Sequence, residues 1–545
     1  MLSSETLRQL ATLLEERRIG AGIALLENCR TEFADTQPDD RCAAEALGCL
    51  AQWVDVGFEG AELLAEMLER FPKAGRHAVP LKGYVHLRLA EALAAMRQEN
   101  LPEALRHLEI ALSICDEVPD PKVAAVANLW KARCLRKAGE YDHALAVTRR
   151  GIRVASEIGL AKMAAVMRTL ESWLLFQKGQ AKPALAMLQE AEAVLRKTDD
   201  LITLGNIQSA YGRIALREGR YDHATQYFDA SIAIFNERAA LEGYLARSLT
   251  NRAQAKRFAA LQLRRSIDAR RERARGQSKR PREDDSGQLE RMHQLLHDAQ
   301  ADLARADAIY KRMGNHHGAG NADVNLASIY LDLGDLDKAD ERAQEAFHLG
   351  ATKADYLLMC RARLAEAMIA NARFEDQIGE SGEVSRFAQL AHDCAKEAVD
   401  LSERTESRRL RAQAHVCHGL TLINGFFNNM EAARASCGRA EEYLDNDRHD
   451  ALWQEVELLR AKILHGGVED PNLRAWSQGE VGDRTLQEVV GDFEELVIRR
   501  VWEREDRKVL RVAQRLSVSP KKVRRVLRRL GVMEEERPIE DRPLS

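Results

Sequence analysis

A pattern that returns about every 40 residues most constrains what this 545-residue chain can fold into. Each copy has an aromatic or other apolar residue followed three positions later by a small one, as in Tyr141-x-x-Ala144. The same frame recurs at Phe58–Ala61, Leu101–Ala104, Ala181–Ala184, Tyr221–Ala224, Leu296–Ala299, Leu336–Ala339, Ala388–Ala391 and Met430–Ala433. The intervals between successive copies are 43, 40, 40, 40, 75, 40, 52 and 42 residues. A period of this length indicates stacked supersecondary units.

Each unit is predicted to be a pair of antiparallel helices. The small residue lets the two helices approach closely, and Gly139, Gly219 and Gly334 suit the turn that ends the first helix. Aromatic residues make up only 5% of the chain, which disfavours a β-sandwich or barrel. Because one pair cannot bury its apolar face alone, we expect an all-α fold with a solenoid of about ten stacked helix pairs over residues 1–465.

The residues that carry the repeat resemble a known family. Gly139-Glu140-Tyr141-x-x-Ala144 and Leu326-Ala327-x-x-Tyr330-x-x-x-Gly334-Asp335-x-x-x-Ala339 are similar to tetratricopeptide repeats, in the longer variant found in bacterial regulators and signalling adaptors. The resemblance implies a concave groove that holds a peptide or protein partner. Another α-solenoid or an irregular helical bundle is the alternative. Trp130, Trp173 and Tyr141 are expected to belong to the core.

Two insertions interrupt the period. The first, at about 263–288, is basic and then acidic, and its Gly, Ser and Pro residues favour an exposed, mobile loop after a helical extension. A solvated loop is the simplest interpretation, and an auxiliary arm that contacts phosphates or a partner protein is the alternative. The second insertion, at 374–386, is acidic and carries no recognisable chemistry.

After the solenoid the chain changes character. Residues 466–484 have the glycine-rich composition of a linker. A small domain is then expected over 485–532, where Thr485-x-x-Glu488 is a capping box that opens a helix reaching about residue 505. A short second helix is predicted at about 507–516. Ser519 and Pro520 start a third helix that Gly531 ends, and an acidic tail follows at 533–545.

The charge of this small domain indicates a nucleic-acid partner. Residues 507–532 contain ten Lys and Arg and no Asp or Glu, in a chain whose net charge is −4. On the third helix, Val523, Val526, Leu527 and Leu530 form an apolar face, and the cations lie outside it. A recognition helix needs this division, because one face packs while the other enters the major groove of DNA.

The same segment resembles the Fis-type (factor-for-inversion-stimulation) helix-turn-helix. The matching residues are Glu494-Glu495-x-x-Ile498, Val512-Ala513-x-x-Leu516-Ser517-Val518-Ser519, Val523-x-x-x-Leu527 and Gly531. Ser517 replaces the usual Gly of the turn, so a positive φ there would cost about 1 kcal/mol. Pro520 and Lys522 replace the usual polar pair at the front of the third helix.

The resemblance implies that the helix at 486–505 pairs with that of a second copy. The helix wheel and this pairing predict two sets of DNA contacts. Lys521, Lys522 and Arg525 are expected to contact base edges. Phosphate contacts are expected from Ser519, Arg524, Arg528 and Arg529.

No enzyme signature accompanies these features. The sequence has no P-loop, no nucleophile elbow, no H-E-x-x-H and no dinucleotide-binding fingerprint. We therefore expect a protein without catalytic residues, metal ligands or cofactors. No apolar run reaches the roughly 18 residues of a membrane span, and nine cysteines without C-x-x-C spacing indicate a cytoplasmic chain with reduced thiols.

Two functional hypotheses remain open at this stage. In the first, the chain is a sequence-specific transcriptional regulator whose solenoid binds a peptide or protein and controls the C-terminal DNA-binding domain. In the second, it is an interaction scaffold whose C-terminal helices mediate self-association or protein binding. The solenoid's ligand, the operator, the oligomeric state and the choice between activation and repression do not follow from the sequence.

Overall fold

The structure is a computed structural model that describes residues 2–40, 42–71, 79–276, 284–376, 384–424, 426–444, 450–466, 483–505, 507–530 and 532. The chain divides into two compact units, Met1–Arg460 and Ala461–Ser545, and each is described by itself. The described secondary structure is entirely helical, which confirms the predicted all-α class. Most of the predicted linker at 466–484, together with Gly531 and the whole predicted tail at 533–545, lies outside the described residues.

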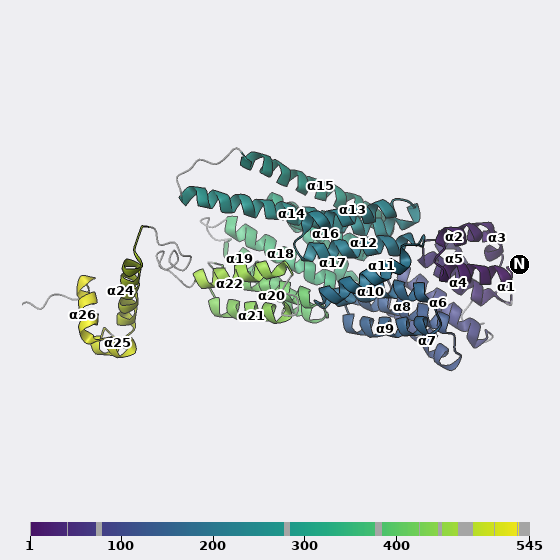
Figure 1. The fold of residues 1–545 in the computed structure, drawn as a ribbon, viewed down its shortest axis with the longest axis horizontal. Coiled ribbons are helices and arrows are strands. Elements are labelled where there is room, and N and C mark those ends of the chain that lie inside the picture. The colour runs from purple at the N-terminus through teal and green to yellow at the C-terminus, as the bar shows by residue number, and fades with distance from the viewer. Residues whose placement is uncertain are drawn as a thin grey trace, which may run out of the picture. The chain divides into compact units, whose positions relative to one another are not determined.

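The first unit is the predicted α-solenoid of stacked helix pairs (Figure 1). The first helices of the pairs are α4 (Ala43–Asp55), α6 (Leu81–Arg97), α8 (Pro121–Ala138), α10 (Ala161–Gln177), α12 (Leu201–Arg217), α14 (Glu242–Gly276), α16 (His316–Leu333), α18 (Tyr356–Asp376) and α20 (Arg408–Leu422). The second helices are α5 (Ala61–Glu69), α7 (Leu101–Glu117), α9 (Tyr141–Glu157), α11 (Ala181–Leu195), α13 (Tyr221–Phe235), α15 (Asp284–Arg312), α17 (Leu336–Thr352), α19 (Val384–Glu403) and α21 (Met430–Leu444). Before them come α1 (Ser4–Glu15), α2 (Ile19–Asn28) and α3 (Arg30–Ala34), and after them α22 (Leu452–Gly466).

In six of its nine copies the repeat pattern marks where the second helix of a pair begins, whereas Phe58 precedes α5 and Leu296 and Ala388 lie inside α15 and α19. Leu101, Tyr141, Ala181, Tyr221, Leu336 and Met430 are the first residues of their helices. The small residue three positions later is fully buried, as at Ala104, Ala144, Ala184, Ala224, Ala339 and Ala433. A methyl group at this position lets the two helices of a pair pack closely.

Glycines end several of the first helices, as expected. Gly139 and Gly334 are C-caps of α8 and α16 with φ of 85° and 83°, and Gly219 follows α12 with φ of 73°. This left-handed conformation favours glycine because other residues carry a Cβ that clashes.

The first insertion differs from its prediction. α14 continues to Gly276, in agreement with the predicted helical extension, but α15 already begins at Asp284, so only 277–283 lies outside the described residues. The two long helices run side by side (Figure 1). Ala260, Met292 and Leu296 are buried together, and Ile267 is 1% exposed, so apolar contacts hold the extension in helical form. The predicted helical extension is therefore confirmed and the mobile loop is wrong for the described part.

Residues far apart in the sequence meet inside the first unit. Asp199, just before α12, accepts hydrogen bonds from the backbone N–H groups of Ile19 and Gly20 at 2.6 and 2.8 Å. Similar contacts join the Gly57 carbonyl to Arg238 (2.8 Å) and the Gly139 carbonyl to the N–H of Glu406 (3.1 Å). Successive turns of the solenoid therefore touch each other.

Two further expectations concern the cysteines and membranes. All nine cysteines are free thiols, and most are buried, as expected for packing residues. Within the described part of the chain, no helix is both long enough and apolar enough to span a bilayer.

Candidate functional site

Beyond the end of α22, the described part of the second unit forms three helices with their own small core. They are α24 (Leu486–Arg504), α25 (Val509–Arg515) and α26 (Pro520–Arg529), and Thr485 and Glu488 form the predicted capping box of α24. The core is apolar and built by all three helices: Ile498, Trp502, Val512, Ala513, Val523, Val526 and Leu527. The predicted buried face of the third helix is confirmed, with Leu530 partly buried beside it.

A tight turn connects α25 to α26. Ser517 lies in it with φ of 52°, the left-handed conformation that the usual glycine of such a turn would adopt without strain. Ser519 is the N-cap of α26, where its hydroxyl oxygen accepts the N–H of Lys522 at 3.2 Å, and Pro520 is the first helical residue. Ser517 thus lies at the left-handed position of the turn, and Ser519 and Pro520 fix the start of α26.

The strained turn leads to a stability prediction. Exchange of Ser517 for glycine is expected to raise the free energy of unfolding of this unit by up to about 1 kcal/mol, because the Cβ clash disappears. Exchange of Ser517 for alanine keeps the Cβ and should give no gain. Hydrogen exchange of the α25 and α26 amides in both variants checks this, and equal protection in the two would contradict it.

The predicted DNA-binding residues fall into two groups. Ser519, Lys521, Arg524, Arg525 and Arg528 are exposed. Lys522 and Arg529 lie on the flank of α26 beside α24 and form ion pairs with Glu494 and Glu495, both at 2.7 Å. No ion pair joins Lys521, Arg524, Arg525 or Arg528 to any described acidic side chain. The exposed centre of the α26 face therefore presents four cations without acidic partners among the described residues.

The interior of the solenoid is the second candidate site. The first helices of successive pairs pack on one another, from α8 to α10 to α12 and onward, and so form the inner layer. Arg133, Trp173 and Arg213 occupy the same place in three of these helices, each 12 residues after the helix start. Successive repeats thus project a column of long side chains inward.

Two guanidinium groups lie against one indole ring in this interior. The Cζ atoms of Arg136 and Arg213 are 5.0 and 5.9 Å from the ring centroid of Trp173. Tyr141 packs edge-on to the same indole at 5.5 Å. Trp173 was expected in the core, but it is only partly buried, whereas Trp130 and Tyr141 are buried as predicted.

These arginines have depressed pKa values. Burial, followed by the neighbouring positive charges of Arg247, Arg136 and Arg361, lowers the pKa of Arg213 to about 9. Burial and the charge of Arg247 lower the pKa of Arg136 to about 10. Both groups still carry their charge at neutral pH, so the interior concentrates positive charge at an energetic cost.

A pocket of about 340 Å³ adjoins this charged region. Helices α1, α4, α6, α8 and α10 line it, largely with apolar side chains such as Leu14, Val126, Leu129 and Met163. Arg133 stands at the pocket too, but Asp55 neutralises it through hydrogen bonds of 2.7 and 2.9 Å. The volume suits an apolar side chain or a small molecule.

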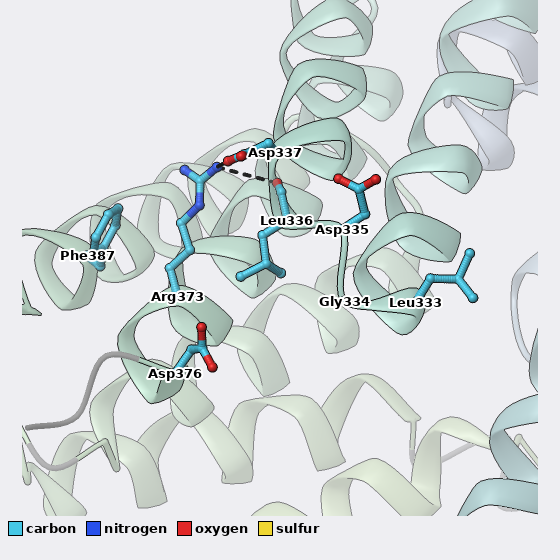
Figure 2. A pocket seen from close by; sticks show the side chains of 8 residues that line it. All are labelled: Leu333, Gly334, Asp335, Leu336, Asp337, Arg373, Asp376 and Phe387. Carbon is cyan, nitrogen blue, oxygen red and sulfur yellow. Dashed lines mark hydrogen bonds and ion pairs between the residues drawn. The ribbon is translucent and has the colours of Figure 1, made fainter.

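A shallower hollow lies at the turn between α16 and α17 (Figure 2). Its one arginine, Arg373, already donates to the Asp337 carboxylate at 2.9 Å and to the Asp340 carboxylate at 3.2 Å. Figure 2 shows Arg373 pointing toward Asp337 and the Leu336 carbonyl. Since these partners satisfy the cation, we place no ligand there.

The turn at this hollow falls in the segment that matches a known family. Residues 324–347 match the tetratricopeptide repeat. This span includes Leu326, Ala327, Tyr330, Gly334 and Ala339, from which the resemblance was predicted. The prediction of a tetratricopeptide repeat is confirmed in this segment.

Comparison with other proteins gives only distant likenesses. No curated protein matches this chain in sequence. A Rap protein complexed with competence and sporulation factor is 13% identical, with 73% of this chain and 99% of that chain covered and a TM-score of 0.49. The apo quorum sensor NprR from B. thuringiensis is 14% identical, with 72% and 97% covered and a TM-score of 0.47. Yeast Tom70 is 12% identical, with 88% and 99% covered and a TM-score of 0.39.

The sequence did not predict the arginine cluster around Trp173. The tetratricopeptide repeat pattern identifies the small and apolar residues of each helix pair, whereas interior positions vary freely between repeats. The period did contain a signal, because Arg133, Trp173 and Arg213 are spaced by 40 residues and so share one place on successive helices. A comparison of the residues at this position in successive repeats would therefore have predicted a charged, aromatic interior.

Proposed function

We propose that this protein is a transcriptional regulator that binds DNA through its C-terminal helices and a peptide or protein through its solenoid. The observation that carries the DNA-binding part is the exposed face of α26, where Lys521, Arg524, Arg525 and Arg528 stand together without acidic partners among the described residues. The segment also resembles the Fis-type helix-turn-helix in sequence. The protein then acts by binding, without catalysis.

The geometry of α26 suits the major groove. Its buried face packs on α24 and α25, and its opposite face presents only long cations. Such side chains reach both phosphates and the acceptor atoms of guanine. Because Lys522 and Arg529 pair with α24, we assign the main contacts to Lys521, Arg524, Arg525 and Arg528 and give the other two a supporting role.

A homodimer through α24 is part of the proposal. Leu486, Val490 and Phe493 are 78, 48 and 48% exposed and recur at intervals of four and three residues, so they form one apolar stripe. A second copy of α24 would cover this stripe. Two recognition helices would then read a roughly palindromic site.

In the regulator, ligand binding in the solenoid changes how the DNA-binding helices are presented. The ligand favours one arrangement of the two units over another, and the DNA affinity shifts with the populations. The ligand can shift these populations only by as much as its affinities for the two arrangements differ.

The salt dependence of DNA binding tests the proposal. We expect the logarithm of the full-length protein's affinity for duplex DNA to fall with the logarithm of salt concentration, with a slope of about −4 or steeper, since four cations per chain displace counterions. Fluorescence anisotropy with a labelled duplex would measure this slope. Salt concentrations of about 50 to 300 mM are suitable, because binding to phosphates weakens strongly over this range. Absence of binding at the lowest salt would contradict the proposal.

The alternative is a non-enzymatic scaffold whose C-terminal helices bind protein. The apolar stripe of α24, together with Leu510 (66% exposed), favours it, because such side chains serve protein contact equally well. In that case the protein self-associates or captures a partner, and the affinity for DNA is negligible at all salt concentrations.

A further inference from the structure

The interior around Trp173 carries positive charge without the acidic partner that Arg133 has. Asp55 neutralises Arg133 nearby. Arg136 and Arg213, by contrast, have no carboxylate within ion-pair distance among the described residues. Both arginines are partly buried, and the loss of solvation lowers their pKa values, so an external anion at this indole ring would stabilise their charges.

Two hydrogen-bond donors lack a partner here among the described residues: one is on Trp173 itself, and one is on Arg247, whose charge acts on both Arg136 and Arg213. The indole Nε1 of Trp173 and the Nε of Arg247 are buried and have no partner among the described residues. Arg247 is held by the side chain of Asn206, one repeat earlier, and Arg361 donates to Asn321 at 2.8 Å in the same way. Since buried donors are nearly always satisfied, a ligand with several acceptor atoms fits this position.

We infer that the interior around Trp173 binds an acidic peptide, whose carboxylates pair with Arg136 and Arg213 and whose apolar side chain enters the pocket beside Arg133. Arginine pairs with carboxylates through two parallel hydrogen bonds, which would also satisfy neighbouring donors. The adjoining pocket favours a peptide over an inorganic or nucleotide phosphate, because a peptide places an aliphatic side chain next to an acidic one. Arg133 and Arg136 are one helical turn apart on α8, so both parts of the site are within reach of a short segment.

This inference rests on the proposed function, in which the solenoid holds a peptide or protein. It adds the chemistry of that ligand. The interior charges are costly to the free protein and are relieved when an anion binds, as is common where a binding site sacrifices stability.

Selection of peptides from a random twelve-residue phage library by the full-length protein tests the inference. We expect the enriched pool to contain an excess of Asp and Glu next to Leu, Ile, Val or Met. The variant R136Q/R213Q should bind the selected peptides at least about tenfold more weakly, the effect of losing charge-assisted hydrogen bonds. The control R153Q/R196Q removes two exposed cations from α9 and the end of α11 and should bind normally.

The melting temperature shows whether the variant folds. R136Q/R213Q should melt at the same or a higher temperature than the parent, because two repelling charges are gone, so lost binding would report the site itself. A pool without excess acidic residues, no enrichment at all, or full binding by R136Q/R213Q would each overturn the inference. Displacement of the selected peptides by inorganic triphosphate at lower concentration than by hexaglutamate would also overturn it, in favour of a phosphate ligand.

DNA binding of the same variants separates this inference from the proposed function. R136Q/R213Q leaves α26 unchanged and should bind DNA like the parent. If peptide selection fails while DNA binding succeeds, only the acidic-peptide inference is wrong. If DNA binding fails while acidic peptides are selected, only the DNA-binding part of the proposed function is wrong.

Discussion

Exchange of Arg524, Arg525 and Arg528 for glutamate is expected to weaken DNA binding at least about a thousandfold. All three side chains are exposed on the face of α26 opposite its buried residues. The substitutions change the charge of that face by six units, so phosphate attraction becomes repulsion. Fluorescence anisotropy with a labelled duplex at 100 mM salt, where the Debye length is about 10 Å, would measure the loss.

A matched control makes this result specific. Arg153, Arg196 and Lys197 are exposed on the solenoid, and their exchange for glutamate alters the net charge by the same amount. That control should lose little affinity, because its charges are remote from α26 in the sequence and outside the proposed interface. Val523, Val526 and Leu527 are untouched in both variants, so the three-helix core is preserved. Parental affinity in the α26 variant would refute our assignment of the recognition face.

Exchange of Asp200 for alanine is expected to destabilise the N-terminal end of the solenoid by about 3–5 kcal/mol. Asp200 is 1% exposed and lies 3.3 Å from Nη1 of Arg17, which is itself 6% exposed. Its carboxylate also accepts the N–H of Thr203 at 3.0 Å as the N-cap of α12. The substitution therefore leaves a buried guanidinium without its carboxylate and removes a helix cap.

Hydrogen exchange is the suitable measurement, because a repeat array unfolds in parts. Amides of α1 and α2 should lose protection most, since Arg17 connects these helices to α12. Asp335 serves as the control, because it caps α17 in a more exposed place and its exchange for alanine should cost about 1 kcal/mol. The double variant R17M/D200A should recover much of the loss by removing the unpaired charge. Unchanged protection in the Asp200 variant would show that the pair does not hold the turns together.

The sequence predicted local structure well, because local structure follows from nearby residues. The frame at Tyr141 and Leu336 identified helix starts, since a small residue is needed three positions later wherever two helices touch. The buried face of α26 followed from the spacing of Val523, Val526 and Leu527. Ser517 showed where a left-handed residue would be needed, and its φ is indeed positive.

Contacts between distant parts of the chain could not be predicted. Nothing near Asp199 indicates that it caps α2, which lies about 180 residues earlier, because no periodic pattern links the two. The ion pair between Lys522 and Glu494 could not be predicted either. A helix wheel shows which residues share a face of one helix, but it contains no information about neighbouring helices. In the first insertion, Gly, Ser and Pro residues predicted a loop after a helical extension, yet α15 already begins at Asp284 and includes Ser286 and Gly287.

Selection of genomic DNA fragments by the purified full-length protein, followed by sequencing, tests the central claim most directly. At physiological salt we predict enrichment of one short palindromic sequence, because two α26 helices in a dimer would read two related half-sites. The α26 triple variant should enrich nothing. Random recovery of fragments, or none, with or without a selected acidic peptide present, would contradict the claim that this protein is a sequence-specific DNA-binding regulator.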